Sequence, residues 1–257
     1  MTKKIFFGVS AIAMSAMLLT SCGLKKVDSI KDLKGRTIGV QLGTTGDTLA
    51  QDIDDASVKP FATAAEAVKF LQNGKIDAVI VDEETAERFV EKNDKIGILD
   101  ENFADERYAV AIAKDNKPLR SEINGALRAL TADGTLAQIK ANYEGDEQGK
   151  HAYVPKEDVD RSKGKLVVAT NAEFPPYEYT ENGEIMGFDI DMMNAVCDYL
   201  GYELEIRNMD FDAVLPAVAN GTVDVGAAGL SITSEREQIV LFSDYYAVTH
   251  QVIIVNK

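Results

Sequence analysis

The sequence predicts an α/β fold built as two lobes. From residue 27 onward, short apolar runs alternate with segments whose apolar residues recur at helical spacing. Residues 144–165 interrupt this alternation with a polar stretch that contains Gly and Pro, as a linker does. The chain has 257 residues, of which 46% are apolar, so it is long enough for two cores of ordinary domain size.

The first 22 residues have the features of a signal peptide. Lys3 and Lys4 precede an apolar run, residues 5–19, that is shorter than the roughly 20 residues of a membrane-spanning helix. The run leads into Leu19-Thr20-Ser21-Cys22, which resembles a lipoprotein lipobox. We expect Cys22 to be lipidated and to become the mature N-terminus. The alternative is a soluble secreted protein that is cut nearby.

Before the linker, strands and helices are expected in turn. Strands are expected where apolar residues run together, at residues 36–42, 76–81 and 108–113. Helices are expected where apolar residues recur every three or four positions, at residues 64–73, 85–91 and 119–143, the last interrupted near Asp133-Gly134. Between the first strand and the next segment, Gly43-Thr44-Thr45-Gly46-Asp47 is typical of a loop that starts a helix.

After the linker the same pattern returns. Strands are expected at residues 166–170, 202–208, 223–228 and 251–255, and helices at residues 189–200, 211–219 and 234–239. Residues 171–179 form an aromatic loop that contains proline. Cys197 shares helical spacing with Ile190, Met193 and Leu200, which predicts a core residue rather than a nucleophile.

The two halves carry similar signals. Lys34-Gly35 and Lys163-Gly164 each precede a strand, and Asn73-Gly74 and Asn220-Gly221 each follow a helix and precede an Asp and a strand. This weak repeat predicts two similar lobes, with ligand-binding loops at the carboxyl ends of parallel strands. Two unrelated domains with chance Asn-Gly turns are the alternative.

Composition excludes several kinds of function. The net charge of −15 disfavours nucleic acid, because phosphate binding needs clustered Lys and Arg. No Cys/His cluster of the zinc type occurs, and His151 and His250 are isolated in the sequence. No nucleophile–base pair is visible either. We therefore expect no metal, no cofactor and no catalytic residues.

Four patterns that each follow an expected strand suggest a ligand site. Gly229 and Ser231 offer close backbone approach and a hydroxyl, and Arg236 offers a planar fork that matches a carboxylate. The helix start at Gly43-Thr44-Thr45 suits an anion. Each of these has an ordinary structural alternative, such as a surface helix cap.

The other two patterns concern a carboxylate and aromatic rings. Asp82 directly follows an apolar strand and suits an ammonium group, although it also suits the N-cap of the next helix. The segment 171–177 brings Asn171, Glu173 and Phe174 together. Phe174, and Phe211 further along, suit the sides of a ligand side chain, or else the core.

Together these patterns resemble the polar amino-acid family of periplasmic solute-binding proteins, which deliver substrates to ABC importers. The match is carried by LVVATNAEFPPYEYTENGEIMGFDID, FDAVLP, GLSITSER, FSDYY, GRTIGVQLGTT and DAVIVD. The resemblance implies a two-lobe type II periplasmic binding protein fold with a hinge. The family's first part corresponds here to residues 166–255 and its second part to residues 30–143, so the order implies a circular permutation.

The resemblance also implies domain boundaries. Residues 1–22 would be the lipoprotein signal peptide, residues 27–110 one lobe, and residues 111–257 the other, with the linker at 144–165 joining the family's usual termini. The crossing at residues 108–113 would then be the only continuous one, and the hinge would be looser than usual.

For the ligand, the resemblance implies a polar L-amino acid held by closure of the lobes. Arg236, with Ser231 and the backbone of Thr45, would bind its carboxylate, and Asp82, with the backbone of Gly229, its ammonium group. Phe174 and Phe211 would flank its side chain. Asn171 stands where several basic-amino-acid binders have Asp. Glu173 either offers a negative wall or faces water. The protein would be a monomer, lipid-anchored outside the cytoplasm, that works with ABC transporter membrane subunits.

Two other functions fit the same resemblance. One is a periplasmic cyclohexadienyl (prephenate or arogenate) dehydratase, for which Glu173 is the best general-acid candidate. The other is a binding module that reports to a separate membrane sensor. The carboxylate and ammonium partners favour binding over catalysis.

Overall fold

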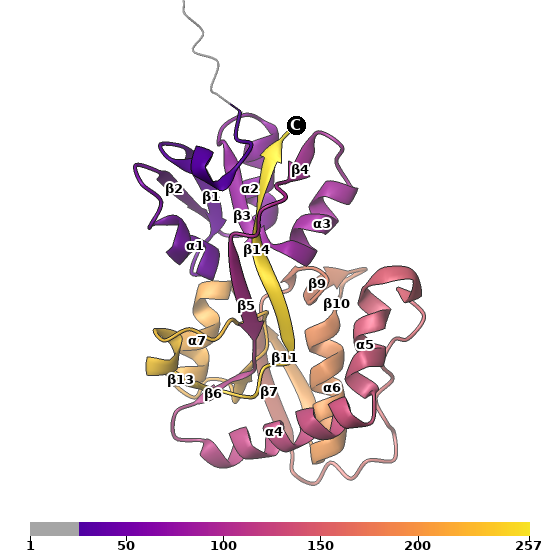
Figure 1. The fold of residues 1–257 in the computed structure, drawn as a ribbon. Coiled ribbons are helices and arrows are strands. Elements are labelled where there is room, and N and C mark those ends of the chain that lie inside the picture. The colour runs from indigo at the N-terminus through magenta and orange to yellow at the C-terminus, as the bar shows by residue number, and fades with distance from the viewer. Residues whose placement is uncertain (1–25) are drawn as a thin grey trace, which may run out of the picture.

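Two lobes, each built on its own β-sheet, lie one above the other in the computed structural model, which describes residues 26–257 (Figure 1). The expected signal peptide and Cys22 lie outside these residues. Within residues 26–257, no helix has both the length and the apolar character needed to cross a bilayer.

The first lobe contains the N-terminal part of the described chain and its last strand. Its sheet runs in the order β2 (Ser57–Phe61), β1 (Thr37–Gln41), β3 (Ala78–Asp82), β14 (Ala247–Asn256) and β4 (Ile96–Ile98), and β5 (Ala104–Tyr108) pairs with β14. The helices of this lobe are η1 (Ile30–Leu33), α1 (Thr45–Ala50), α2 (Ala64–Gln72) and α3 (Glu83–Glu91).

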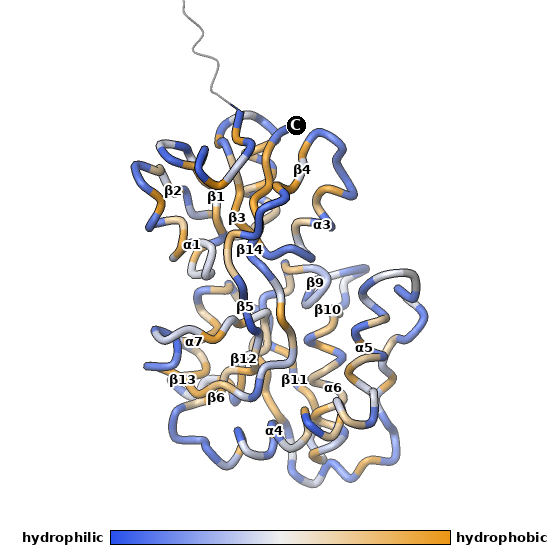
Figure 2. The backbone as a smooth tube through the Cα atoms, viewed as in Figure 1, coloured by the Kyte–Doolittle hydropathy of each residue, from blue (hydrophilic) through white to orange (hydrophobic). Residues whose placement is uncertain are grey.

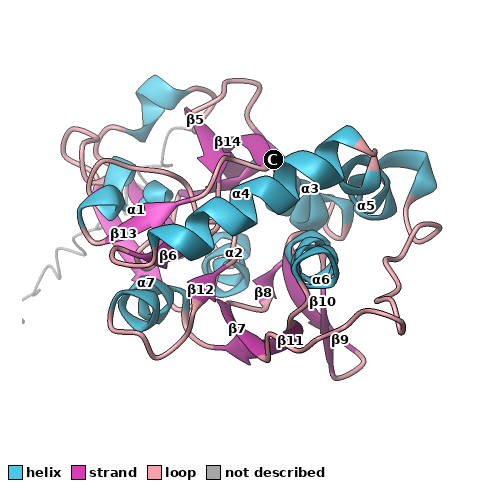
Figure 3. Cartoon of the chain, turned by 90° about the horizontal axis from the view of Figure 1, so that it is seen from below, coloured by secondary structure: helices cyan, strands magenta, loops and turns pink. Residues whose placement is uncertain are grey.

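The second lobe holds the middle of the chain. Its sheet runs in the order β11 (Glu203–Asn208), β7 (Lys165–Thr170), β12 (Val225–Gly226), β6 (Ala111–Ala113) and β13 (Val240–Phe242). A small separate sheet contains β8 (Glu173–Phe174), β9 (Glu178–Glu181) and β10 (Glu184–Met186). The helices are α4 (Lys117–Ala132), α5 (Thr135–Tyr143), α6 (Phe188–Leu200) and α7 (Phe211–Ala219), with short turns η2 (Gly145–Glu147) and η3 (Arg236–Gln238). In Figure 3, α4 and α6 lie to one side of this sheet and α7 to the other.

The two large sheets have the same strand order and directions. In each, three parallel strands are followed by one antiparallel strand, β14 or β6, that enters from the other lobe. The repeat extends to single hydrogen bonds, because Asp77 Oδ2 accepts from Thr37 N at 2.8 Å and Asp224 Oδ2 accepts from Val167 N at 2.7 Å. The weak repeat in the sequence therefore reflects two similar lobes.

The strands at the centre of the first sheet are buried on both faces. Ile80 of β3 and Ile253 of β14 pack in one apolar cluster, while Val79 and Ile254 pack in another on the opposite face. Burial on both faces explains why these strands are continuously apolar rather than alternating. In Figure 2 the apolar colour follows these strands through the middle of the lobe.

The lobes are joined at two places, which corrects two expectations. The chain crosses once between β5 and β6 and again between β13 and β14, and β5 and β14 pair in an antiparallel ribbon from Ala104 to Tyr108 (Figure 1). β14 was expected in the lobe of residues 111–257, but it pairs with β3 and β4 of the other lobe. Because both crossings are continuous, the expected single crossing is wrong, and the looser hinge loses the observation from which it was inferred.

The linker, residues 144–165, is bound to the second lobe by hydrogen bonds and an ion pair. Tyr153 Oη and Lys156 N donate to Asp198 Oδ2 of α6 at 2.7 Å and 2.8 Å, and Arg161 forms an ion pair with the same carboxylate. Charge-assisted bonds to one nearly buried group fix the path of a segment that has few apolar anchors.

Several expected elements differ in extent. The expected strand at residues 108–113 is two strands, β5 and β6, separated at Ala109-Val110, and the expected helix at 234–239 is only the turn η3. Strands β2 and β4 and the β9–β10 hairpin were not expected, because their residues are largely polar or only half-buried. The break of the long helix at Asp133-Gly134 is confirmed.

Candidate functional site

A cavity lies between the lobes, at the carboxyl ends of β1, β3, β7 and β12. Both lobes contribute to its wall, which is formed by Gln41, Thr44, Thr45, Asp82, Glu106, Asn171, Phe174, Phe211, Ala228, Gly229, Ser231 and Arg236. This is the position that the sheet topology predicts for a ligand. All the predicted site residues except Gly43 and Glu173 line this cavity, although their contacts with a ligand remain predictions.

Arg236 is the buried cation of the site. Its side chain sits on η3 with the residue only 9% exposed, and its Nη1 donates to Ser231 O at 2.9 Å. Its Nη2 reaches the other lobe and donates to Gly43 O at 3.1 Å, while the guanidinium lies 5.6 Å from the ring centre of Phe211. Burial lowers the pKa of Arg236, and the charges of Glu106 and Asp82 act against that shift. A guanidinium has five N–H donors, so donors remain for a carboxylate.

Asp82 faces Arg236 from the other lobe. It ends β3 and occupies the N-cap of α3, but its side chain makes no capping hydrogen bond. Instead the carboxyl group turns into the cavity, where Tyr108 Oη donates to Oδ1. Burial, followed by the charge of Glu106, raises the pKa of Asp82 well above its ordinary value.

Glu106 is a second buried acid in the same cavity, and the sequence reasoning missed it. Its Oε2 accepts from Ser231 Oγ at 2.8 Å and from Gln251 Nε2 at 3.1 Å. The signal that points to it is alternation along β5, where Asp105 and Arg107 are exposed while Glu106 and Tyr108 are buried. An acid on the buried side of a strand is expensive unless it has partners, which makes it a functional candidate.

The loop at Gly43-Thr44-Thr45 forms a capped helix start, as expected. Thr44 Oγ1 accepts from Asp47 N at 3.1 Å, and Gly43 adopts a φ of 78° that favours glycine. The Gly43 N–H, however, donates to Asp47 Oδ2 at 3.1 Å, so this amide is engaged within the loop. Gly43 takes part in the site through its carbonyl oxygen, which accepts from Arg236, and Thr45 lies on the cavity wall.

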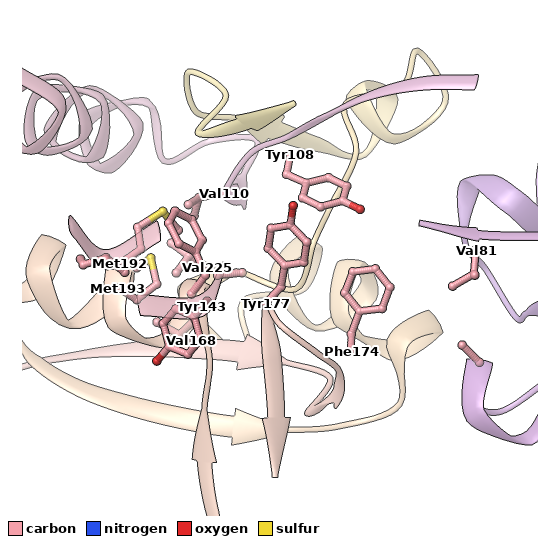
Figure 4. Packing of buried hydrophobic residues seen from close by; sticks show 14 of the residues in the cluster. Val81, Tyr108, Val110, Tyr143, Val168, Phe174, Tyr177, Met192, Met193 and Val225 are labelled. Carbon is pink, nitrogen blue, oxygen red and sulfur yellow. The ribbon is translucent and has the colours of Figure 1, made fainter. Parts of the chain in front are cut away.

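Phe174 lines the cavity and packs in a cluster of aromatic rings. Phe174 stacks on Tyr177 with centroids 5.8 Å apart, and Tyr177 meets Tyr108 edge-on at 5.0 Å. Figure 4 shows the Tyr177 ring next to those of Tyr108 and Phe174, with Val81 of the other lobe further away beyond Phe174. Gly229 has a φ of 54°, and a Cβ there would lie 2.8 Å from Phe174 Cε1, so only glycine allows this approach.

Glu173 does not belong to the site. It is exposed on β8 and is absent from the wall of the cavity, whereas its neighbours Asn171 and Phe174 point inward. In the two-residue strand β8, successive side chains point to opposite faces, so burial of Phe174 turns Glu173 to the outside. The expected negative wall at Glu173 is therefore wrong.

Hydrogen bonds across the cavity hold the lobes together. Gln41 Nε2 of the first lobe donates to Asn171 Oδ1 of the second at 3.0 Å, and Thr85 Oγ1 donates to Pro175 O at 2.7 Å. With the Arg236–Gly43 bond, these contacts define a closed arrangement of the lobes. Gln41 was not anticipated, since a Gln at the end of a strand gives no local signal.

Behind the cavity wall lies a buried acid pair. Asp189 Oδ2 accepts from Gly229 N at 3.0 Å and from Tyr246 Oη at 2.7 Å, and Glu178 is fully buried beside it. Burial raises the pKa of Asp189 to about 6, and burial with the nearby Asp189 charge raises that of Glu178. Asp189 thereby fixes the backbone of the Gly229 loop.

Other candidates have structural roles. Cys197 is buried in α6, and burial raises the pKa of its thiol to about 12, so the prediction of a core residue is confirmed. Within the part of the chain that the structure describes, no group of His, Cys, Asp and Glu residues is arranged to hold a metal ion.

Comparison with known proteins gives matches that each cover part of the chain. The sequence model of the bacterial extracellular solute-binding proteins, family 3, matches residues 166–257. The arginine-binding extracellular protein ArtP of Bacillus subtilis (strain 168) is 37% identical over 95 residues, which are 37% of this chain and 37% of that protein. A probable histidine-binding protein of Neisseria gonorrhoeae is 38% identical over 112 residues, 43% of this chain and 40% of that protein.

A solved structure gives a similar partial match. The arginine-bound form of truncated ArgBP from T. maritima is 43% identical, over 34% of this chain and 42% of that chain, with a TM-score of 0.33. Each match thus spans about two fifths of the length of the protein compared.

Proposed function

We propose that this chain is a member of family 3 of the bacterial extracellular solute-binding proteins, whose sequence model matches residues 166–257, and that it captures a polar L-amino acid for an ABC importer. One observation carries the proposal: Arg236 from one lobe and Asp82 from the other line the same cavity. A guanidinium and a carboxylate on opposite walls match the carboxylate and the ammonium group of one zwitterion.

The residues that line the cavity suggest how the ligand binds. The ligand carboxylate meets Arg236, with Ser231 and Thr45 beside it, and the ammonium group meets Asp82 near Gly229. The side chain extends between Phe174 and Phe211. At its far end, the amides of Gln41 and Asn171 supply both donors and acceptors, so a cationic side chain is not required. The relatives named above are called arginine-binding and histidine-binding, which supports the amino-acid class.

The mechanism that we propose is closure around the ligand. Bonds between the lobes, such as Arg236–Gly43 and Gln41–Asn171, exist only when the lobes meet. A ligand with one end on each lobe binds the closed state better than the open one and shifts the population towards it. The partners are then the membrane subunits of the importer, and the protein acts as a monomer.

A thermal-shift screen against the common amino acids tests the function. At a free ligand concentration of about 100 times Kd, one amino acid is expected to stabilise the protein by about 2.7 kcal/mol. For a chain of this size that raises Tm by about 5–10 °C. If every amino acid leaves Tm unchanged while isothermal calorimetry also shows no heat, the proposed function is wrong.

The dehydratase alternative has lost the residue that supported it. Glu173 was its general-acid candidate, and this side chain is exposed outside the cavity. Nothing else about the site favours turnover over binding, so we propose a non-enzymatic role.

We also propose that the chain is a circular permutation of the family's usual order, with residues 144–165 joining the family's two ends. The family match starts at residue 166, which lies in β7, the first strand after this segment. Val27, at the start of the described chain, packs in the same apolar cluster as Val255, near the end of β14. Two segments that are adjacent in the lobe but distant in the sequence are what a permutation produces.

For localisation we propose a lipid anchor at Cys22, outside the cytoplasm. Replacing Cys22 by Ser removes the thiol that the lipid needs. The variant is expected to move from the membrane fraction to the soluble extracytoplasmic fraction, as followed by immunoblotting of the separated fractions. A Cys197→Ser variant, whose thiol is buried in α6, is the matched control and should stay with the membrane. Membrane retention of Cys22→Ser would rule out lipidation at this residue.

A further inference from the structure

Two acids of the cavity, Asp82 and Glu106, both lie beside Gln251 of β14: Gln251 pairs in register with Asp82, and its Nε2 donates to Glu106 Oε2 at 3.1 Å. Each acid is only 6% exposed, and both line the cavity wall. An ionised carboxylate has no proton to donate, so a hydrogen bond between two carboxyl groups requires that one of them be protonated. Two ionised carboxylates buried in one cavity would also repel each other, which favours protonation of one of them.

The surrounding donors indicate which acid keeps the proton. Glu106 accepts from two donors, Ser231 Oγ at 2.8 Å and Gln251 Nε2 at 3.1 Å. Asp82 accepts from Tyr108 Oη, and hydrogen bonds from Tyr108 and Gln251 act against the rise of its pKa. Burial, then the charge of Glu106, raises the pKa of Asp82 well above its ordinary value. The shared proton therefore resides on Asp82.

The other titratable groups around the pair do not replace this proton. Arg236 is near both acids, but its two described bonds go to the carbonyl oxygens of Ser231 and Gly43. Burial raises the pKa of Tyr108 and that of Tyr177, which keeps both hydroxyls neutral. Burial raises the pKa of Glu178 well above its ordinary value, and the charges of Asp189 and Asp82 add to the rise.

We propose that Glu106 is a second ligand-binding acid, and that the ammonium group of the amino acid takes the place of the proton that Asp82 and Glu106 share. An ammonium group has three N–H donors, enough for one bond to each acid, and its positive charge offsets the negative charge that Asp82 gains when it loses the proton. Binding then releases the proton to solvent. The inference rests on the proposed amino-acid function, and it adds a pH dependence that simple pairing of Asp82 with the ligand at neutral pH does not require.

The direction of the pH dependence follows from the raised pKa of Asp82. Below that pKa the ligand must displace a proton, so affinity falls as pH falls, by up to about tenfold per pH unit. Above it the pair is already ionised, and affinity no longer changes with pH. Protons therefore compete with the ligand for the acid pair, and they compete more strongly as the pH falls.

Calorimetry tests the proposal directly. L-Arginine is titrated into the purified protein at about pH 5 to about pH 8, in two buffers of different ionisation enthalpy at each pH. L-Glutamine is the second probe if arginine produces no heat. The expected result is release of close to one proton per bound ligand on the acid side of this range, declining towards higher pH. Equal heats in both buffers at every pH would overturn the proposal while leaving the binding function intact.

A Glu106→Gln variant separates ligand contact from a structural role. The Gln carbonyl still accepts from Ser231 and Gln251, so the local bonds persist, but the second acid is gone. Proton release and the pH slope of the affinity are expected to flatten. If the variant binds more weakly yet releases as many protons as the wild type, Glu106 is only a support for Ser231. Glu237→Gln, which removes an exposed carboxylate of η3, is the matched control and should behave as the wild type.

The calorimetric titration also separates failure of the proton-release inference from failure of the proposed binding function. Binding without proton release contradicts the inference alone. Binding of neither amino acid counts against the proposed function, and the inference falls with it.

Discussion

Replacing Arg236 by Ala is expected to weaken amino-acid binding by about 30-fold to about 4,000-fold, which corresponds to about 2–5 kcal/mol for removal of one partner of a buried charge pair. The loss is large because the ligand carboxylate would be left in a cavity whose other charges, Asp82 and Glu106, are acids. Calorimetric titration with the amino acid found by thermal screening measures the effect.

Two further variants make the Arg236 result interpretable. Arg236→Lys keeps the charge but loses the planar fork, so it should recover only part of the affinity. Arg120→Ala, an exposed arginine on α4 of the same lobe, should bind as the wild type does. Because Arg236 also bonds to Ser231 O and Gly43 O, thermal unfolding must show that Arg236→Ala is still folded. A folded variant with near-native affinity would remove Arg236 from the site.

Replacing Asp82 by Asn is expected to reduce affinity on the same scale, about 2–5 kcal/mol, while leaving the ligand-free protein as stable as before or more so. The amide cannot neutralise an ammonium group, so binding is lost. The expected effect of Asp82→Asn on stability has the opposite sign to its effect on affinity. Burial raises the pKa of Asp82 in the folded state, so ionisation of this group destabilises the fold as pH rises above its unfolded pKa. Asn carries no such penalty at neutral pH.

Calorimetry and thermal unfolding near neutral pH measure the two effects of Asp82→Asn separately. Asp94→Asn, at an exposed position after α3, is the control for losing one acid and should change neither quantity. An Asp82→Asn protein that binds normally would contradict the assignment of the ammonium site. An Asp82→Asn protein that is much less stable would instead show that the carboxylate supports Tyr108 rather than the ligand.

Local sequence signals predicted the parts of the fold that depend on neighbouring residues. The Asn73-Gly74 and Asn220-Gly221 turns, the break at Asp133-Gly134 and the buried strand β3 all follow from backbone preferences and apolar runs within a few residues. The loops that carry Asp82 and Ser231 were found in the same way, because each directly follows a strand.

What the sequence did not reveal depends on distant partners. β14 belongs to the first lobe because it pairs with β3, which lies about 170 residues earlier in the chain. No local sequence pattern encodes a pairing over that distance. Gln41 and Gln251 become site residues only because Asn171 and Glu106 lie opposite them. Glu173 was misplaced for a simpler reason, since in a strand of two residues nothing but the packing of Phe174 decides which side faces inward.

The paired crossings also constrain how the molecule can move. A ribbon of two antiparallel strands flexes readily across its flat face, but it resists sliding and twisting, because those motions break its rungs. On its other edge, β5 is tied to the segment with Ser231, where Ala109 N donates to Leu230 O and Ile232 N to Arg107 O. Flexing of the ribbon is therefore expected to move Ser231 as well. Separation of the lobes and displacement of Ser231, a proposed ligand contact, would then occur together.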